Sequence, residues 1–261
     1  MNPALRTAAT GMAAQQTRTE VIANNLANVN TTAFKASRAA FEDLLYQSLR
    51  EVQAVDNADA SSLGAIQVGR GVRLAAINRI HAQGTMENTQ RQLDLAIEGN
   101  GFFGLRSNTG ATVYTRDGNF DVSDQGVLVN KQGLTLEPRI TIPEDATDIT
   151  IGPSGIVSAV RPGGTIVEVG RIPLYKFPNP SGLVSMGGNL YQESPSSGTA
   201  TMGGATEEGF GTINQGYLEA SNVEIVTEMV EMISAQRAYE INSKAVKAAD
   251  EMSEVATQLV R

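Results

Sequence analysis

The sequence predicts an α+β protein with long N- and C-terminal helices that pair as a coiled coil and a β-rich domain inserted between them. Two observations lead to this prediction. Each end of the 261-residue chain carries apolar side chains at helical spacing, and the middle carries glycine turns at regular intervals. We expect residues 1–30 and 221–261 to form a helical core domain, residues 31–84 an extended connector, and residues 85–220 a β-rich outer domain.

The C-terminal helix is predicted from residue 221 to the end of the chain, because no glycine or proline interrupts this segment. Ser221 stands three residues before Glu224, which is the spacing of an N-terminal capping box. Apolar and small side chains recur at steps of three, four or seven, so they share one helix face: Ile225, Met229, Met232, Tyr239, Val246, Ala249, Ser253, Ala256 and Val260. A narrow stripe on a helix of roughly 55–60 Å favours a coiled-coil seam or a filament interior.

The N-terminal helix is predicted to begin with Asn2 as its cap and Pro3 in its first turn. Its stripe consists of residues seven apart, namely Leu5, Met12, Thr19 and Leu26, with a second row three residues behind at Ala8, Gln15, Ile22 and Val29. The asparagines that follow disfavour further helix, because their side chains compete for backbone hydrogen bonds. Periodicity alone leaves open that both helices simply cover one face of an ordinary core.

The central region is predicted to be a β meander. Gly110, Gly118, Gly126 and Gly133 lie about eight residues apart and are separated by short strand-like stretches, the rhythm of successive hairpins. We expect an all-β module over roughly residues 85–215. The Ser-, Thr- and Gly-rich residues 193–212 are predicted to form a flexible loop.

The connector is harder to assign. Apolar residues between positions 41 and 52 fit a helix of about three turns: Phe41, Leu44, Leu45, Leu49 and Val52. The stretch Asp56–Gly71 that follows is polar and contains several glycines. A connection of this length is too long for an ordinary loop and indicates either a functional role or mobility.

Composition excludes several classes of protein. The formal net charge is −8 and no cluster of basic residues is present, which argues against nucleic-acid binding. No apolar run is long enough to cross a membrane, so we expect no direct membrane insertion. The chain has no cysteine, so it can form neither a disulfide nor a thiolate site. Residues 1–14 lack the apolar core of a secretory signal peptide.

Two motifs imitate ligand sites. Residues 99–104 read G-N-G-F-F-G, the spacing of a dinucleotide-binding loop, but a turn follows instead of a helix. These glycines are better explained by close backbone approach in a strand. Asp117, Asn119 and Asp121 imitate the start of a calcium loop, but Val122 and Leu128 replace its required glycine and glutamate. We expect these acidic residues to serve turns.

No catalytic constellation is visible. His81 is the only histidine, so it has no second histidine or cysteine with which to hold a metal, and no nucleophile is paired with it. The methionines of the last helix are better explained by packing than by a binding groove. We therefore expect no enzyme activity, no cofactor and no metal.

Several groups of residues together resemble the signatures of bacterial flagellar rod and hook proteins. They follow one another in the family's order along nearly the whole chain: Ala23–Asn28 with Thr31–Lys35, Ala96–Phe103, Tyr114–Phe120, Ser221–Val223, and Glu228–Lys244 with its core Met232–Glu240. Within the family, the length and the region 46–77 are most similar to distal rod subunits. Proximal rod proteins and the longer hook-type axial proteins share both ends and remain alternatives.

The resemblance implies a structural subunit that stacks helically into a hollow, rigid drive shaft. The terminal helices would line a central channel for exported proteins, and the β-rich domain would form the outer layer. Such a subunit would be exported without a cleavable signal peptide and assemble in the periplasmic part of the basal body. Its partners would be further copies of itself, proximal rod proteins, the hook protein, the outer ring proteins that act as a bushing, and the export apparatus.

The residues predicted to carry self-assembly lie on the two stripes: Leu5, Met12, Ile22, Leu26, Ile225, Met229, Met232, Tyr239 and Val246. An alternative from another functional class stays open, because a secreted β-rich binding module would share the central glycine turns.

Overall fold

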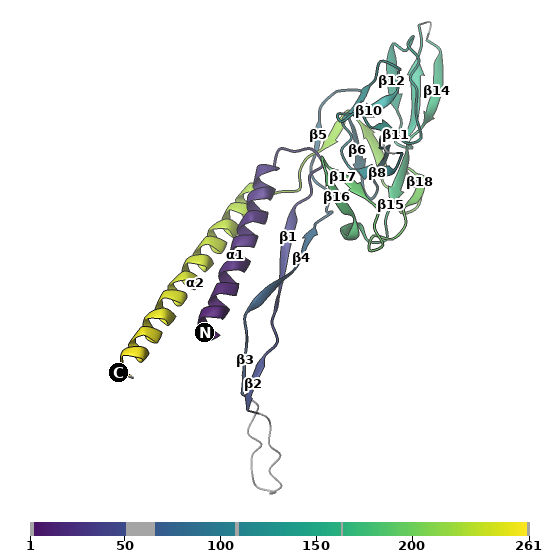
Figure 1. The fold of residues 1–261 in the computed structure, drawn as a ribbon. Helices are drawn as coiled ribbons and strands as arrows, with labels where there is room; N and C mark the ends of the chain where they lie inside the picture. Colours follow the sequence, from purple (N-terminus) through teal and green to yellow (C-terminus); the bar gives the residue numbers. More distant parts are fainter. Residues whose placement is uncertain (1–2, 51–65, 108–109, 163, 260–261) are drawn as a thin grey trace, which may run out of the picture. The chain divides into compact units, whose positions relative to one another are not determined.

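The computed structural model describes residues 3–50, 66–107, 110–162 and 164–259. They fall into two compact units that interleave along the chain. The first, here called the helical unit, comprises Met1–Leu26, Ser37–Asn78 and Glu224–Arg261, and the second, the β unit, comprises Ala27–Ala36 and Arg79–Val223. The α+β class, with two helices and a β-rich central domain, is confirmed (Figure 1).

The β unit is built around one sheet of seven strands, in which every neighbouring pair is antiparallel. In sheet order the strands are β16 (Val184–Gly187), β17 (Leu190–Gln192), β8 (Thr112–Thr115), β7 (Phe103–Arg106), β11 (Thr135–Leu136), β10 (Leu128–Asn130) and β9 (Phe120–Val122). The remaining strands form smaller antiparallel groups: β12 (Asp148–Ile151), β13 (Ile156–Val160) and β14 (Ile166–Arg171); β15 (Pro173–Lys176) with β18 (Thr201–Gly204); β6 (Leu95–Glu98) with β19 (Thr212–Gln215); and β5 (Met86–Asn88) with β20 (Tyr217–Glu219). A short 3₁₀ helix, η1, spans Pro180–Gly182.

The predicted glycine turns are confirmed for three of the four positions. Gly110, Gly126 and Gly133 have φ values of +85°, +73° and +78°, a region that glycine enters without steric cost. They lie in the connections β7–β8, β9–β10 and β10–β11. Gly118 serves a different purpose, because a Cβ there would collide with the carbonyl oxygen of Leu95.

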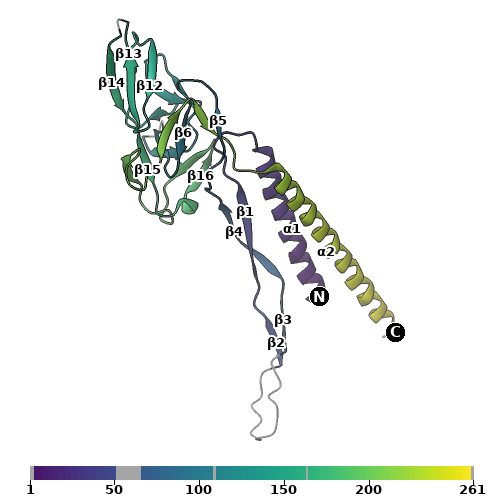
Figure 2. The same ribbon diagram turned by 180° about the vertical axis from the view of Figure 1, so that it is seen from behind.

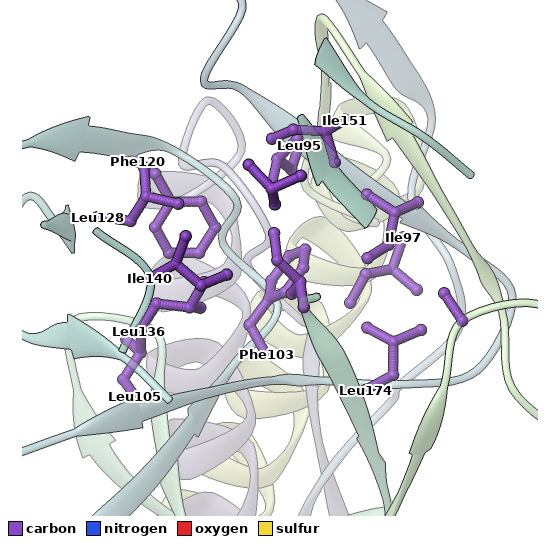
Figure 3. Packing of buried hydrophobic residues seen from close by; sticks show 14 of the residues in the cluster. Leu95, Ile97, Phe103, Leu105, Phe120, Leu128, Leu136, Ile140, Ile151 and Leu174 are labelled. Atoms are coloured by element: carbon purple, nitrogen blue, oxygen red, sulfur yellow. The ribbon is translucent and has the colours of Figure 1, made fainter. Parts of the chain in front are cut away.

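The core of the β unit consists of aromatic and branched side chains that successive strands direct to the same side (Figure 3). Phe103 and Phe120 are fully buried and meet edge to face at a centroid distance of 5.3 Å. Leu105, Leu128 and Leu136 pack in the same cluster. Alternate residues of a strand point to the same side, which is why Phe103 and Leu105 of β7 enter the same cluster.

The segment 193–212 is ordered, so the prediction of a flexible loop is wrong. Ser194 and Ser197 close a turn in which the Ser194 amide donates to Ser197 Oγ at 2.9 Å and Ser197 Oγ donates to the Ser194 carbonyl at 2.8 Å. β18 follows, with Gly203 pressed against the ring of Phe210. Serine and glycine here supply turn hydrogen bonds and close packing, which their average polarity does not reveal.

The helical unit contains α1 (Pro3–Ala27), α2 (Ile225–Leu259) and a long antiparallel arm between them in sequence (Figures 1 and 2). The arm consists of β1 (Ser37–Asp43) paired with β4 (Val72–Arg79) and, further out, β2 (Gln47–Arg50) paired with β3 (Ile66–Val68).

The helix expected between positions 41 and 52 is therefore replaced by strands. β1 has a burial pattern that alternates over its first five residues, and the Leu44 amide donates to the Gly71 carbonyl at 2.9 Å. Apolar spacing over a dozen residues fits either element, and only the distant pairing partner decides between them. Val52 and the start of the polar stretch lie outside the described residues.

α2 begins four residues later than predicted. The Glu228 amide donates to the Glu224 carbonyl, which makes Glu224 the capping position, and Ser221 Oγ accepts from the nearby Val223 amide at 3.3 Å. The predicted capping box is therefore wrong. At the other end of the chain α1 includes Pro3 in its first turn, as predicted, whereas the proposed cap Asn2 lies outside the described residues.

We predict that Phe103→Ala lowers the free energy of unfolding of the β unit by about 3–5 kcal/mol, because it empties a fully enclosed aromatic site. Ile166→Ala is the control: Ile166 is 70% exposed, and the expected change is below about 0.5 kcal/mol. Urea denaturation followed by circular dichroism measures both values, and similar values for the two variants would contradict the assignment of the core.

Candidate functional site

α1 and α2 run antiparallel within the helical unit. Arg18 Nη2 donates to Glu231 Oε2 at 3.1 Å, and Asn25 Nδ2 donates to Glu228 Oε2 at 3.2 Å. Nearer the start of α1, Gly11 lies against the side-chain amide of Asn242. A Cβ added to Gly11 would stand 2.9 Å from Asn242 Nδ2. Residues later in α1 therefore contact residues earlier in α2, and both views of the ribbon show the antiparallel pair (Figures 1 and 2).

Small side chains occupy the facing surfaces of the two helices. On α1, Ala14 and Ile22 are buried and share a face with Gly11, Arg18 and Asn25 through steps of three and four. On α2, Ala235 and Ala249 are buried at 0% and 3% exposure. They share a face with the α2 residues that contact α1. We call this the α1-facing side of α2.

α2 also carries apolar side chains that are uncovered. Those at least 48% exposed are Val226, Met229, Val230, Ile233, Ile241, Met252 and Val255, which range up to 69% exposed. The first four occupy adjacent turns and form an uninterrupted cluster, whereas charged residues such as Arg237 and Lys244 separate the others. We call these seven residues the exposed apolar face. Single exposed apolar residues are ordinary, but a contiguous cluster of them indicates an interaction surface.

The structure distributes the nine predicted assembly residues over different environments. Ile22 is buried at 3% exposure. Leu5, Met12, Leu26, Met232 and Val246 are partly buried, and Ile225, Met229 and Tyr239 are exposed. The predicted stripe of α2 therefore does not coincide with one physical surface.

Only Met229 of the exposed apolar face belongs to the predicted stripe, which leaves out the other six members: Val226, Val230, Ile233, Ile241, Met252 and Val255. The first four of these follow one another at steps of four, three and eight residues, which satisfies the same helical periodicity as the predicted stripe. The helical spacing of these residues was therefore visible in the sequence. It was not recognised because α2 carries two apolar faces, and a search for one stripe selects residues from both.

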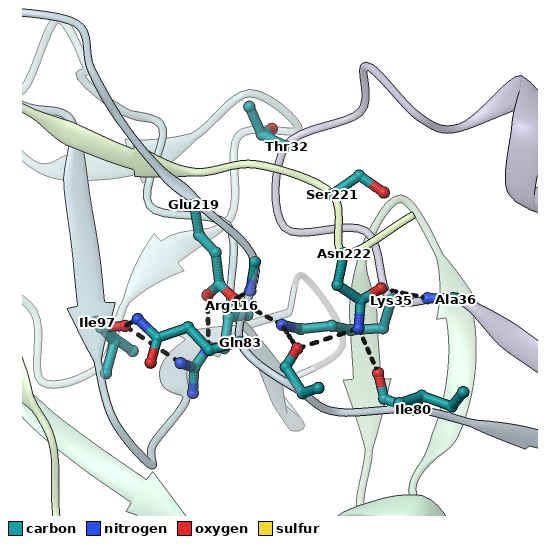
Figure 4. A network of polar contacts seen from close by, with 12 residues as sticks. Thr32, Lys35, Ala36, Ile80, Gln83, Ile97, Arg116, Glu219, Ser221 and Asn222 are labelled. Atoms are coloured by element: carbon teal, nitrogen blue, oxygen red, sulfur yellow. Dashed lines mark hydrogen bonds and ion pairs between the residues drawn. The ribbon is translucent and has the colours of Figure 1, made fainter. Parts of the chain in front are cut away.

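A second polar feature lies in the β unit, where a carboxylate is buried between two cations (Figure 4). Glu219 accepts from Lys35 Nζ at 2.5 Å, from Arg116 Nε at 2.7 Å and from the amide of Gly84 at 2.8 Å. The Glu219 side chain has 0% exposure and that of Lys35 1%. The remaining Arg116 hydrogen bonds go to the carbonyls of Ile97, Gly99 and Gly101.

The electrostatics of this cluster favour the charged state of Glu219. Burial alone raises the pKa of its carboxyl, but Arg116 and Lys35 outweigh burial and hold that pKa below its usual value. Burial also lowers the pKa of Lys35, and Glu219 opposes this effect. Ion pairs this well enclosed are costly to break, because the remaining partner keeps an uncompensated buried charge.

Asn222 extends the network to the chain segments next to both helices. Its Oδ1 accepts from the Ala36 amide at 2.7 Å, and its Nδ2 donates to the carbonyls of Ile80 and Ala82 (Figure 4). The Ala33 amide donates to the Glu219 carbonyl at 2.7 Å. The segment that follows α1 and the segment that precedes α2 are thus tied together inside the β unit.

The motifs that imitated ligand sites are structural. No helix follows residues 99–104. A Cβ added to Gly101 would stand 3.2 Å from Leu174 Cδ1, and a Cβ added to Gly104 would collide with the ring of Tyr175. Asp117 Oδ1 accepts from Thr32 Oγ1 at 3.2 Å and from the Asn119 amide at 3.1 Å, which closes a turn. Among the described residues no group of three or more Asp, Glu or His side chains is arranged to hold a metal ion.

We predict that Glu219→Gln destabilises the β unit by about 3–5 kcal/mol at neutral pH, because two buried cations lose their counter-charge. Asp121→Asn, which breaks the exposed pair with Arg91, is the control and should cost below about 1 kcal/mol. Because the folded-state pKa of Glu219 is lowered, its contribution is present above the unfolded pKa of about 4 and is lost as the pH falls through the folded value. The difference between wild type and Glu219→Gln in urea denaturation should therefore shrink in acid, and a pH-independent difference would contradict this explanation.

Comparison with known proteins places these features in one family. Three family models match the chain, described as "Flagella basal body rod protein" over residues 5–35, "Flagellar hook protein FlgE/F/G D1 domain" over residues 96–159, and "Flagellar basal body rod FlgEFG protein C-terminal" over residues 214–259. The first and last of these include both helices together with Lys35 and Glu219.

Similar proteins extend over almost the full length. The flagellar basal-body rod protein FlgG of Caulobacter vibrioides is 47% identical, with 98% of both chains covered, and that of Borreliella burgdorferi is 45% identical, with 100% of both covered. The rod protein FlgF of Caulobacter vibrioides is 35% identical, with 92% of this chain and 90% of the relative covered. A solved structure of the Helicobacter pylori hook protein FlgE2 is only 18% identical, with a TM-score of 0.25 over 61% of this chain and 47% of that one, too remote to bear on the fold. The resemblance seen in the sequence is confirmed, and the chain belongs to the FlgG family of flagellar basal-body rod proteins.

Proposed function

We propose that this chain assembles helically, through its terminal helices, into the hollow and rigid distal rod of the flagellum. The rod would transmit torque from the motor to the hook and leave a channel through which exported proteins pass. The observation that carries this proposal is the exposed apolar face of α2. Contacts between different surfaces of identical subunits generate an open helical filament rather than a closed ring when the rotation does not close.

The exposed apolar face supplies a driving force for association. Burying one valine, isoleucine or methionine side chain completely contributes about 1.5–3 kcal/mol. The cluster of Val226, Met229, Val230 and Ile233 alone therefore offers several kcal/mol per subunit if neighbouring copies cover it. Part of this energy offsets the entropy that each subunit loses on association, so the face favours assembly at high local concentration.

We also propose that α1 and α2 pair as a coiled coil whose second apolar side is closed by other copies. Gly11, Ala14, Ala235 and Ala249 are small enough for the two backbones to approach closely at the α1-facing side. Five of the nine predicted assembly residues then fall into two groups. Ile22, Met232 and Val246 would belong to contacts within the subunit, whereas Met229 and Ile225 would belong to contacts between subunits.

For the domain organisation we propose an inner layer of residues 1–30 and 221–261 and an outer layer of residues 85–220. Residues 31–84, expected to form a connector, include the β1–β4 arm, which groups with the helices. The arm is a candidate for additional contacts within the inner layer.

The partners proposed for the chain are further copies of itself, proximal rod proteins, the hook protein, the ring proteins around the rod and the flagellar export apparatus. Their support is the name that the relatives share, "basal-body rod protein". We propose export without a cleavable signal peptide and a periplasmic location in the basal body. None of the described helices is long and apolar enough to span a membrane. A secreted binding module has no support among the relatives.

We predict that Ile233→Glu raises the protein concentration needed for polymerisation more than tenfold, because assembly would bury an unpaired carboxylate. Gln236→Glu adds the same charge three residues further along α2 at a position that is already polar, and it should assemble like the wild type. Sedimentation of polymer over a concentration series, together with a circular dichroism spectrum of each variant, gives the comparison. Equal critical concentrations for Ile233→Glu and the wild type would sink the proposed role of this face.

A further inference from the structure

A half-enclosed cavity of about 260 Å³ lies in the β unit beside the buried ion pairs. Four basic side chains line it, those of Lys35, His81, Arg116 and Lys176. The other lining residues include the polar Asn100 and the aromatic Phe102 and Phe177. No carboxylate is among the described residues that line this cavity, which is unusual in a chain with a net charge of −8.

The positive charge around the cavity exceeds its compensation. Glu219 is the single carboxylate bound to both Lys35 and Arg116, so these three groups together carry a charge of +1. Lys176 adds a second positive charge, and it forms no ion pair with any residue in the described ranges. In a cavity with low-dielectric walls such an excess is felt strongly, because little water screens it.

The pKa of His81 responds to the positive charge around the cavity. Its ring stands edge-on to Phe102 and Tyr191, at centroid distances of 5.8 and 5.5 Å, and its buried Nδ1 has no hydrogen-bond partner. Burial, and then the charges of Lys35, Arg79 and Arg116, lower the pKa of His81 to about 4, while Glu219 acts in the opposite direction. The imidazole is therefore neutral at physiological pH, and a negative charge in the cavity would raise its pKa.

We propose that this cavity binds a carboxylate, whose charge faces the basic side chains and whose carbon side rests against the aromatic walls. The group has two conceivable sources. One is a small free carboxylate ion, and the other is an aspartate or glutamate side chain of a second copy of this chain. The second source rests on the proposed assembly, whereas binding of the carboxylate itself does not.

The test uses the unassembled full-length chain and sodium formate as the probe. Because His81 is the only histidine, its ring protons give unique nuclear magnetic resonance signals. Formate should shift these signals saturably and raise the apparent pKa of His81 by about 1 unit or more, because a nearby anion favours the imidazolium form. Sodium chloride at equal ionic strength should produce no saturable shift.

Variants of Lys176 show whether the effect arises in this cavity. Lys176→Gln should weaken the formate effect at least tenfold, and Lys176→Arg, which keeps the charge, should retain it. Lys131→Gln is the matched control, since Lys131 lies in the β10–β11 connection and does not line the cavity. Absence of a saturable shift in the wild type, or an equal shift in wild type and Lys176→Gln with an unchanged melting temperature, would overturn the proposal.

A sedimentation experiment distinguishes the two sources once binding is established. If a second copy supplies the carboxylate, formate should inhibit assembly of the wild type more than chloride does, and Lys176→Gln should assemble poorly. If the source is a free ion, formate should leave assembly unchanged. Because the resonance measurement needs no polymer, failure of the carboxylate site and failure of the proposed assembly give different results.

Discussion

The buried carboxylate of Glu219 is the interaction on which the organisation of this chain depends. The β unit consists of two separate pieces of sequence, and Glu219 bridges them by binding Lys35 from the first piece and Arg116 from the second. Because the segment with Lys35 follows α1 and Glu219 stands just before α2, the same bond fixes where the chain leaves the β unit toward each helix. An apolar contact could supply comparable stability, but charge-assisted hydrogen bonds from two different cations to the two oxygens of one carboxylate also fix the positions of the partners.

A different constraint governs the helical unit. α2 presents apolar residues on two opposite sides, and the chain supplies a partner for only one of them. Ala235 and Ala249 lie on the α1-facing side, whereas Val230 and Ile233 face solvent. Under the proposed assembly, the side that α1 leaves uncovered becomes buried when the subunit meets copies of itself. We therefore propose that self-assembly follows from how apolar residues are divided along this helix.

Features of the fold that depend on neighbouring residues could be predicted from the sequence, whereas those that depend on contacts between distant residues could not. The two helices and three of the four glycine turns follow from local spacing, and they were predicted correctly because helical periodicity and left-handed turns are local properties. The strands β1 and β2 were missed, since each is recognised as a strand only through a partner later in the sequence, β4 for β1 and β3 for β2. Apolar spacing alone also fits a helix. The ordered segment around Ser194 was missed because its polar side chains bond to its own backbone.

The candidate site shows the same division. Residues such as Ile22 and Met229 were found from their periodicity, but which side of each helix they occupy depends on contacts such as Arg18–Glu231 that no local pattern encodes. The roles of Lys35, Arg116 and Glu219 could not be predicted from the sequence, because the three are separated by 81 and 103 residues. They lie within segments that resemble family signatures or directly beside one, which is the only signal that could have drawn attention to them.

The absence of cysteine makes one measurement especially direct. In Val230→Cys the new thiol would be unique in the chain and would lie in the exposed apolar face, and Thr165→Cys places one in the exposed β13–β14 turn for comparison. A maleimide reagent should label both variants as monomers. In assembled rods it should label Thr165→Cys but leave Val230→Cys protected. Equal labelling of Val230→Cys in monomers and rods would contradict burial of this face between subunits.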